Sequence, residues 1–443
     1  MAVTTESGLL SMLKVFYAKE GLVNLLFRND EFLKTIKKQR VEGKTQNFSA
    51  LYTRGGAVSA TWTKAKALAT QTAQAKEFAI EPGQLFSAAV FNNKELLASR
   101  TLRGAYLPIA SAKMFANAES FRKTLAVALY GSGHGELFTT TGSFAMTAAT
   151  EVVQTWPTSA IMGIDIGSQV EYKVSPAATA IADTAVVTAI DMANKAVTVV
   201  PASTATLATG GVVCIAGCTD NDGRPMLPVG LSGWLPSTAP SSTDNFFGVN
   251  RSVAPDRLAG TRYAAPGGEA KYVSLQNAIL SVSRYGSRAN VIIMNDADRL
   301  ALAKEVENKT YFTKANGGDG KSAANVGYGD IGIAVNKNFL DTVIGSPYCP
   351  AGTGYVLDSD TVELWTFSNA DKIDDGAADP YKPEVNGENT VQDKPYQMMV
   401  DDLFTIQPGT DTADGPAAVV GIMFYGEFVV TNPSMNAVVK FAA

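Results

Sequence analysis

Residues 314–327, KANGGDGKSAANVG, contain Gly320, Lys321 and Ser322, a triplet that ends many phosphate-binding loops. In such a loop a glycine stands five residues before the Gly-Lys pair, which lets the backbone N–H groups curl around the phosphate. Here that position holds Ala315. The loop should also follow a strand and open a helix, whereas the residues before it have helical spacing and no helix is expected after it. We therefore interpret the stretch as a glycine-rich loop and not as a nucleotide site.

Other side chains with catalytic potential are scarce. The chain has one histidine, His134, and the glycines around it are expected to mark the end of a helix. Cys214, Cys218 and Cys349 are too few and too odd in number for a disulfide framework, which predicts a reducing compartment. Cys214 and Cys218 lie in an apolar, strand-like run and are expected to be core residues. No cluster has metal-ligand spacing, so we expect no catalytic residue, no metal and no cofactor.

Length and composition are those of a large globular protein. The 443 residues correspond to about three domains, and 46% of them are hydrophobic. No apolar run approaches the ~18 residues of a membrane span, and the N-terminus does not have the pattern of a signal peptide. The net charge of −5 argues against tight binding to nucleic acid.

The charges are unevenly distributed along the chain. Residues 44–76 contain five basic residues and no acidic one, whereas residues 358–414 contain 14 acidic residues and three lysines. Two such segments attract each other, either within one chain or between copies of it. We therefore expect the basic segment to take part in an interface.

Apolar periodicity divides the chain into segments of different character. Residues 5–40 have helical spacing, and residues 44–90 predict a long two-stranded projection of ~18 residues per leg, about 60 Å in reach. Residues 111–130 predict a helix with one apolar stripe, stopped by Gly131. Residues 150–218 alternate short β-type runs with turns, which is typical of a small sandwich or barrel.

The second half predicts an α/β region followed by strands. A helix from about residue 270 leads into a buried strand, NVIIMN, and a second helix follows with Asn295 as its N-cap. Strands return after residue 350. In the last of them Met423, Tyr425, Glu427 and Val429 alternate with the other face, and Pro433 divides two legs.

This order of segments resembles the major capsid proteins of tailed bacteriophages, which have the Hong Kong 97-like fold. The stretches GLSGWLP, FFGVNRSVAPDRLAG, NVIIMNDADRLAL and GIMFYGEFVVTNPSMNAVVKF are similar to stretches of that family. The resemblance covers most of the chain, and it is weakest at residues 150–218.

The resemblance implies an α+β capsid fold with an inserted small all-β domain. The implied parts are an N-terminal helical arm (1–43), an extended loop (44–90), a peripheral domain with a spine helix (91–149), an inserted β-rich domain (150–235), an axial α/β domain (236–350) and C-terminal strands that return to the peripheral domain (351–443). The residues assigned to these parts are Arg54, Trp62, Lys64, Lys66 and Lys76 on the extended loop, Met114, Phe121 and Leu125 in the core of the spine helix, and Gly317, Gly318, Gly320 and Lys321 on a loop near the capsomer axis.

The implied function is structural, not enzymatic. The chain would assemble with itself into pentamers and hexamers of an icosahedral phage head that encloses double-stranded DNA, contacted without sequence specificity. A portal is a further implied partner, a separate scaffolding or decoration protein stays open, and no membrane is involved. The implied location is the capsid shell of the virion, after assembly in the host cytoplasm.

Three alternatives stay open from the sequence. The first is a β-rich surface adhesin or cell-surface layer protein, which would suit the Ala/Thr/Gly-rich middle of the chain. The second is an enzyme such as a hydrolase with two converging carboxylates. The third concerns the shell itself, because some members of the resembled family link a loop lysine to a neighbour's asparagine. Lys64 or Lys66 with Asn432 or Asn436 would be the pair here, although we favour solvated lysines without a covalent role.

Overall fold

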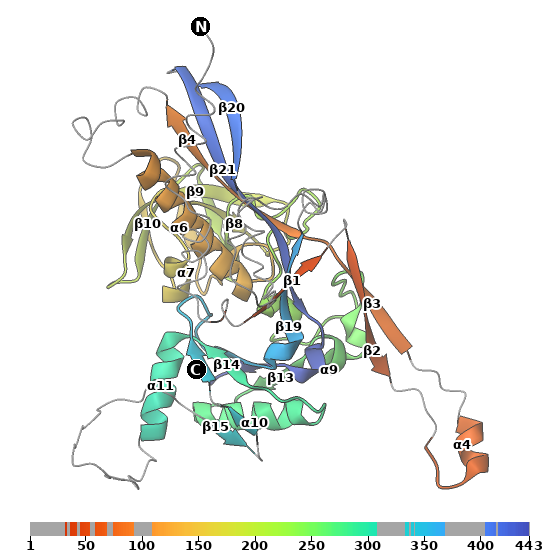
Figure 1. Cartoon of the computed structure of the whole chain (residues 1–443). Coiled ribbons are helices and arrows are strands. Elements are labelled where there is room, and N and C mark those ends of the chain that lie inside the picture. Colours follow the sequence, from red (N-terminus) through yellow and green to blue (C-terminus); the bar gives the residue numbers. More distant parts are fainter. Residues whose placement is uncertain are drawn as a thin grey trace, which may run out of the picture.

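Helices and strands interleave along the chain, which confirms the α+β class predicted from the sequence (Figure 1). The computed structural model describes residues 32, 36–41, 45–53, 58–68, 74–92, 109–307, 333–335, 338–340, 342–367, 404–412 and 415–442. Arg54, Gly317, Gly318, Gly320 and Lys321 lie outside the described residues, and so does most of the acidic segment 358–414. Among the described helices, none is long and apolar enough to cross a membrane.

The first sheet is organised around one long strand, β21 (Gly415–Val430). Its N-terminal half pairs with β20 (Phe404–Thr412) on one side and with β4 (Gly83–Asn92) on the other. Its last residues pair with β19 (Val362–Phe367), so that β19 follows β20 along the same side. The sheet therefore joins segments from both ends of the sequence.

Helix α6 (Ile109–Tyr130) packs on this sheet against β4 and β21 (Figure 1). Phe121 and Leu125 are 3% and 1% exposed, and the helix ends directly before Gly131, as its apolar stripe predicts. Met114 lies on the same helix, in the part whose side chains are not described. Phe121, Leu125, Leu129 and Tyr130 of α6 belong to the main hydrophobic cluster of the molecule.

A six-stranded sheet follows α6 and has a hydrophobic cluster of its own, which includes Trp156, Tyr172 and Val197. Its strands, in spatial order, are β5 (Glu136–Thr139), β12 (Val212–Ile215), β8 (Gln169–Lys173), β9 (Ile181–Asp191), β10 (Ala196–Pro201) and β7 (Val152–Thr155). A two-stranded ribbon, β6 (Phe144–Met146) with β11 (Ala205–Leu207), and the short helix α7 (Thr158–Met162) complete it.

The six-stranded sheet begins earlier than the expected boundary at residue 150. Strand β5 starts at Glu136 and pairs with β12, more than 70 positions further along the chain. Four residues are too short to display an alternating pattern, so only this distant pairing makes them a strand. The expected hairpin connection between Asp191 and Lys195 is present between β9 and β10.

A second five-stranded sheet holds the C-terminus. Its strands, in spatial order, are β13 (Thr261–Ala264), β22 (Ala437–Lys440), β18 (Thr353–Leu357), β14 (Val291–Met294) and β17 (Thr342–Gly345). Helices α10 (Lys271–Ser283) and α11 (Asp296–Glu307) cover it, and Asn295 Oδ1 accepts the Ala297 N–H at 3.0 Å as the expected N-cap. The shorter elements are α8 (Leu231–Trp234), η1 (Arg251–Val253), α9 (Pro255–Leu258), β15 (Ile333–Val335), β16 (Asn338–Leu340), η2 (Ser359–Thr361) and η4 (Pro433–Met435).

The two C-terminal legs belong to different sheets, which differs from the expectation that the final strands return together. Strand β21 ends at Val430 in the first sheet, and β22 lies between β13 and β18 in the second. The turn η4 separates them, and Asn436 fixes the turn because its fully buried side chain accepts the Asp358 N–H and donates to Thr361 Oγ1.

The N-terminal arm is not helical at its end. Residues 37–41 form β1 (Lys37–Val41), which pairs in parallel with β19, and they correct the prediction of a helix through residue 40. Ile36 and Val41 are buried beside this pairing. A long-range strand partner thus overrides the local helical spacing.

The extended loop is shorter in its paired part than expected. Strands β2 (Gln46–Thr53) and β3 (Gln74–Ile80) form the hairpin, so its legs have 8 and 7 residues and not ~18. Between them lies helix α4 (Trp62–Leu68), and residues 83–90 belong to β4 of the first sheet. The hairpin ends at Ile80, and β4 begins at Gly83. Position 83 requires glycine because a Cβ there would lie 2.4 Å from the Pro228 nitrogen.

Charging the buried stripe of α6 is expected to prevent folding. Phe121→Asp or Leu125→Asp would place an unpaired carboxylate in the main core, at a cost of several kcal/mol. We expect each variant to be absent from the soluble fraction, as measured by expression and sedimentation. Ser120→Asp is the matched control, because Ser120 is exposed on the same helix. Soluble Leu125→Asp protein at the wild-type yield would contradict the assigned face.

Candidate functional site

The hairpin β2–β3 projects from the body of the molecule and carries α4 at its far end (Figure 1). Its root is built on stacked aromatic rings. The rings of Phe48 and Phe78 stack with centroids 5.1 Å apart, and Phe78 lies 5.6 Å from the Trp234 ring. Phe48 also meets the edge of Trp365 of β19 at 6.1 Å. The root of the hairpin is therefore part of the main hydrophobic core.

Backbone contacts add to this packing. The Arg257 guanidinium donates to the Tyr52 carbonyl oxygen at 2.7 Å, and the Ala79 N–H donates to the Phe247 carbonyl oxygen at 3.1 Å. These bonds tie one strand to α9 and the other to the loop at residues 246–249. Both legs of the hairpin are thus fixed in direction before the chain reaches the tip.

Arg251 holds the loop that carries Phe246 and Phe247. Its Nε and the Asp244 carboxylate are 2.9 Å apart, and its Nη1 donates to the Gly233 carbonyl oxygen at 2.7 Å. The guanidinium lies 3.9 Å from the centre of the Phe246 ring. Because this side chain is only 5% exposed, it acts as an internal clamp for the aromatic root and not as a surface charge.

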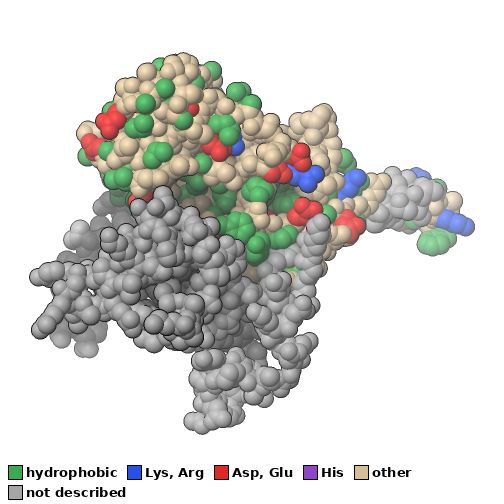
Figure 2. All heavy atoms as spheres, turned by 90° about the horizontal axis from the view of Figure 1, so that it is seen from above, with side chains coloured by type: hydrophobic (Ala, Val, Ile, Leu, Met, Phe, Trp, Pro, Cys, Tyr) green, Lys and Arg blue, Asp and Glu red, His purple; other side chains and the backbone are tan. Residues whose placement is uncertain are grey.

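The tip of the hairpin differs from its root in being solvent-exposed. Val58 and Trp62 are 95% and 81% exposed, which is unusual for such large apolar side chains. Lys64 and Lys66 are exposed on the same short helix, whereas Lys76 lies half-buried on β3. Figure 2 shows hydrophobic and basic side chains together at the outer end of the projection. We call Val58, Trp62, Lys64 and Lys66 the tip surface.

A buried carboxylate lies where the hairpin joins the first sheet. Glu427 of β21 is 1% exposed. Its Oε2 accepts the Gly83 N–H at 3.1 Å, and its Oε1 accepts the Val229 N–H. Burial raises the pKa of this carboxyl well above its ordinary value, although the backbone N–H groups of Val229, Gly83 and Phe428 act in the opposite direction.

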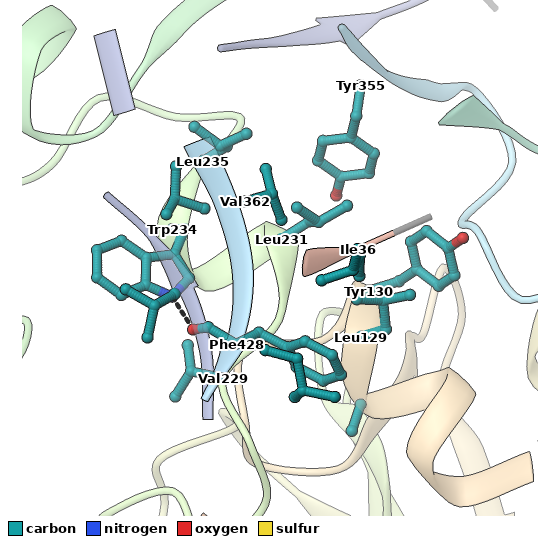
Figure 3. Close-up of a cluster of buried hydrophobic side chains, with 14 of the residues drawn as sticks. Ile36, Leu129, Tyr130, Val229, Leu231, Trp234, Leu235, Tyr355, Val362 and Phe428 are labelled. Atoms are coloured by element: carbon teal, nitrogen blue, oxygen red, sulfur yellow. Dashed lines mark hydrogen bonds between the residues drawn. The ribbon is translucent and has the colours of Figure 1, made fainter. Parts of the chain in front are cut away.

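The neighbouring Phe428 carbonyl oxygen accepts the indole N–H of Trp234 at 2.6 Å (Figure 3). Figure 3 places this bond among the buried side chains of β21, α6, α8 and β19. The alternating pattern of residues 423–430 predicts that Glu427 lies on a strand, but it does not predict these bonds. The available signal was an acidic residue inside the apolar run MFYGEFVV, which indicates either a solvent-facing position or a buried one with specific partners.

His134 is half-buried, and Cys214 and Cys218 are buried. Burial, with the nearby Lys173 charge, lowers the pKa of His134 to about 4, and Thr219 Oγ1 lies 3.5 Å from its Nδ1. Burial raises the pKa of the Cys214 and Cys218 thiols to about 12, so both are protonated at neutral pH and unreactive. Within the described part of the chain, no group of three or more His, Cys, Asp or Glu residues is arranged to hold a metal ion.

The asparagines considered for a cross-link also differ in access. Asn436 is fully buried, and its side chain bonds to the backbone of Asp358 and Asn432 and to Thr361. A lysine of another molecule cannot reach it without unfolding of η4. Asn432 is partly exposed, with its Oδ1 accepting the Ser434 hydroxyl.

Comparisons with known proteins give matches among solved structures alone. No family model matches the sequence, and no curated protein does. Similar structures include a cyanophage A-1(L) capsid (13% identity, 93% of this chain and 92% of that chain, TM-score 0.47). Others are the capsid of an empty GTA particle (12%, 93% and 89%, TM-score 0.43) and a protein of Mycobacterium phage Bobi (9%, 94% and 91%, TM-score 0.42).

Truncating the root of the hairpin is expected to destabilise the whole subunit. Phe78 is fully buried, and Phe78→Ala should lower the free energy of unfolding by about 3–5 kcal/mol, as large-to-small changes in cores do. Urea unfolding followed by tryptophan fluorescence measures this loss. Leu51→Ala, at a position 58% exposed on the same hairpin, should change stability by no more than ~0.5 kcal/mol. Equal stability of the two variants would mean that the root is not part of the core.

Proposed function

We propose that this protein is the major capsid protein of a tailed bacteriophage, with a Hong Kong 97-like fold. The observation that carries the proposal is the hairpin with a packed root and an uncovered tip. Val58 and Trp62 are 95% and 81% exposed at the end of a projection whose base is fixed in the main core. A projection with a packed root and apolar side chains at its end is suited to covering a neighbouring subunit.

The energetics favour a second copy as the partner of the tip. Burying a large apolar side chain contributes roughly 1.5–3 kcal/mol, and each subunit of a closed shell would supply one such arm and receive one. The lysines of the tip surface add long-range attraction to acidic groups, which the chain carries in excess between residues 358 and 414. No catalytic centre is needed for this role.

The finer assignments belong to the same proposal. The extended loop would be the hairpin with α4, the spine helix would be α6, and the axial region would contain the glycine-rich loop near residue 320. The subunits would form pentamers and hexamers around packaged double-stranded DNA, with a portal at one vertex. The six-stranded sheet would be the inserted β domain, since it has its own hydrophobic cluster inside an otherwise mixed chain.

Negative-stain microscopy of the purified full-length protein tests the proposal. Closed shells or capsomers are the expected result. Fibres or flat lattices would instead favour the adhesin or cell-surface layer alternative, and small monodisperse particles would favour an enzyme. Either of these last two outcomes would overturn the shell function.

Reversing the charge of the tip is expected to impair assembly without unfolding the subunit. Lys64→Glu with Lys66→Glu changes two exposed residues that lie outside the core. Each exposed pair contributes only ~0.2–1 kcal/mol, but a shell repeats it many times. Light scattering across a salt series should show weaker assembly of the variant, and weaker wild-type assembly as salt rises, because exposed charges are screened beyond ~8 Å at physiological salt.

The matched control for this experiment is Lys64→Arg with Lys66→Arg, which changes both side chains and keeps both charges. We expect it to assemble like the wild type. Equal assembly of the Glu and Arg variants, with no dependence on salt, would show that the charge of the tip is incidental.

The six-stranded sheet is expected on the outer face of the shell. The sheet from β5 to β12, with its two-stranded ribbon, lies beside α6, and Lys123 Nζ of α6 is 2.6 Å from the Asp165 carboxylate. A density map of assembled particles should place this unit on the outside. A map with the unit on the lumenal side, facing the DNA, would contradict the prediction.

A further inference from the structure

Glu427 joins three segments that are distant in the sequence. Its carboxylate lies on β21, and its two backbone donors are Gly83, at the start of β4, and Val229, in the segment between the six-stranded sheet and α8. Gly83 directly follows the hairpin, and Val229 directly precedes the residues that pack on the hairpin root. One side chain therefore holds the hairpin, the sheet and the exit from the β-rich region together.

The two donor segments are in close contact with each other. The Gln84 N–H donates to the Met226 carbonyl oxygen at 2.7 Å, and a Cβ on Gly83 would lie 2.4 Å from the Pro228 nitrogen. Water therefore has no access to the carboxylate unless β4 and residues 226–229 separate. Hydrating a charge on Glu427 requires this local opening.

No cation balances the carboxylate within the described part of the chain. Its hydrogen-bond partners there are backbone N–H groups, and the segment at residues 226–234 and the described side chains of β4 carry no ionisable group. The ionisable side chains on the other elements that surround it are Glu363 of β19, Tyr425 of β21, Glu81 of the β3–β4 turn, Lys37 and Lys38 of β1, and Glu119, Arg122, Lys123 and Tyr130 of α6. Of these, Glu363 accepts the Trp365 indole N–H and Lys37 pairs with Asp360. On α6, Arg122 and Lys123 both pair with Glu119.

We propose that Glu427 is a proton-operated latch at the root of the hairpin. With its proton bound, the side chain is neutral and holds Gly83 and Val229 against β21. When the proton leaves, a buried charge without a counter-ion favours opening of the contact between β4 and residues 226–229. The hairpin root then gains freedom while the rest of the core stays packed.

The direction of the pH dependence follows from linkage. The carboxyl has a raised pKa in the closed state and an ordinary one, about 4.3, once the junction is open to water. The closed state thus binds more protons than the open state between these two values. The junction is most stable below the ordinary pKa of Glu and loses stability as pH rises toward the folded pKa, by up to tenfold in the opening equilibrium per pH unit.

Hydrogen exchange of single amides tests this inference directly. In the wild-type full-length protein, protection of the Gly83 and Val229 amides should fall between pH 5 and pH 8, after correction for the base-catalysed intrinsic rate. The Val187 amide, which donates to the Ser168 carbonyl oxygen inside the six-stranded sheet, is the internal reference and should keep constant protection. The measurement needs no particles, so its result is independent of whether the proposed shell function holds.

Two variants sharpen the test. Glu427→Gln keeps the shape and one acceptor but cannot ionise, so it should lower the protection of one of the two amides and abolish the slope with pH. Glu363→Gln, a carboxylate on the same sheet with a different partner, should retain the wild-type slope. In the wild type, amide protection that is flat or rises with pH would overturn the latch. This wild-type measurement tests the proposal even if Glu427→Gln does not fold. A slope that persists in Glu427→Gln would overturn it equally.

Discussion

The structure depends on which groups bond to β21 beyond the end of its partner strand β4. The pairing with β4 stops at Gly426, opposite Gly83, while β21 continues to Val430. Beyond that point no strand of the described residues lies on the β4 side of β21, and the segment that contains Val229 and Trp234 lies there instead. Trp234 donates to the Phe428 carbonyl oxygen, and the Glu427 carboxylate accepts the Val229 N–H. Because buried backbone groups need partners, this arrangement allows β21 to run deep into the core.

The contacts at this end of β21 also set the direction of the hairpin. Trp234, which caps β21, is also in contact with Phe78, Phe246 and Phe247. The indole thus connects the edge of the first sheet to the root of the projection, while Arg251 fixes the loop beneath it. A change in the edge of the sheet is therefore transmitted to the hairpin through packed rings and not through a flexible linker.

Local patterns were sufficient for elements whose own residues form a long apolar stripe or an apolar run with clear boundary residues. The stripe of α6 with Gly131 after it, and the strand NVIIMN followed by an Asn295-capped helix, all appear where the sequence predicts them. Strands β1 and β5 were missed because each becomes a strand only through a partner far along the chain. Trp62, Lys64 and Lys66 were assigned to the extended loop through the family resemblance, Val58 was not named, and the sequence did not show that α4 interrupts the hairpin.

The role of Glu427 lay outside the reach of any local pattern. Its donors are 344 and 198 positions away, and both are backbone groups that carry no sequence signal. The aromatic root has the same character, since Phe48, Phe78, Trp234 and Trp365 come from four separate segments. Alternation along β21 predicted one buried face, but residues 427–430 are buried on both faces, because residues 226–235 cover the side that would otherwise be open.

The division between root and tip separates two kinds of free energy. Packing of the rings at the root is gained when the single chain folds, so it fixes the direction of the arm at no cost to later association. Val58 and Trp62 are exposed in the single chain. The free energy of burying them therefore contributes to association with another molecule and not to folding. The tip lysines contribute mainly to the rate and register of the encounter, and the apolar residues to its strength. Glu427, the proposed latch, lies at the base of the hairpin, on the side of the root away from the tip, so loss of its proton would loosen the root without changing the tip surface.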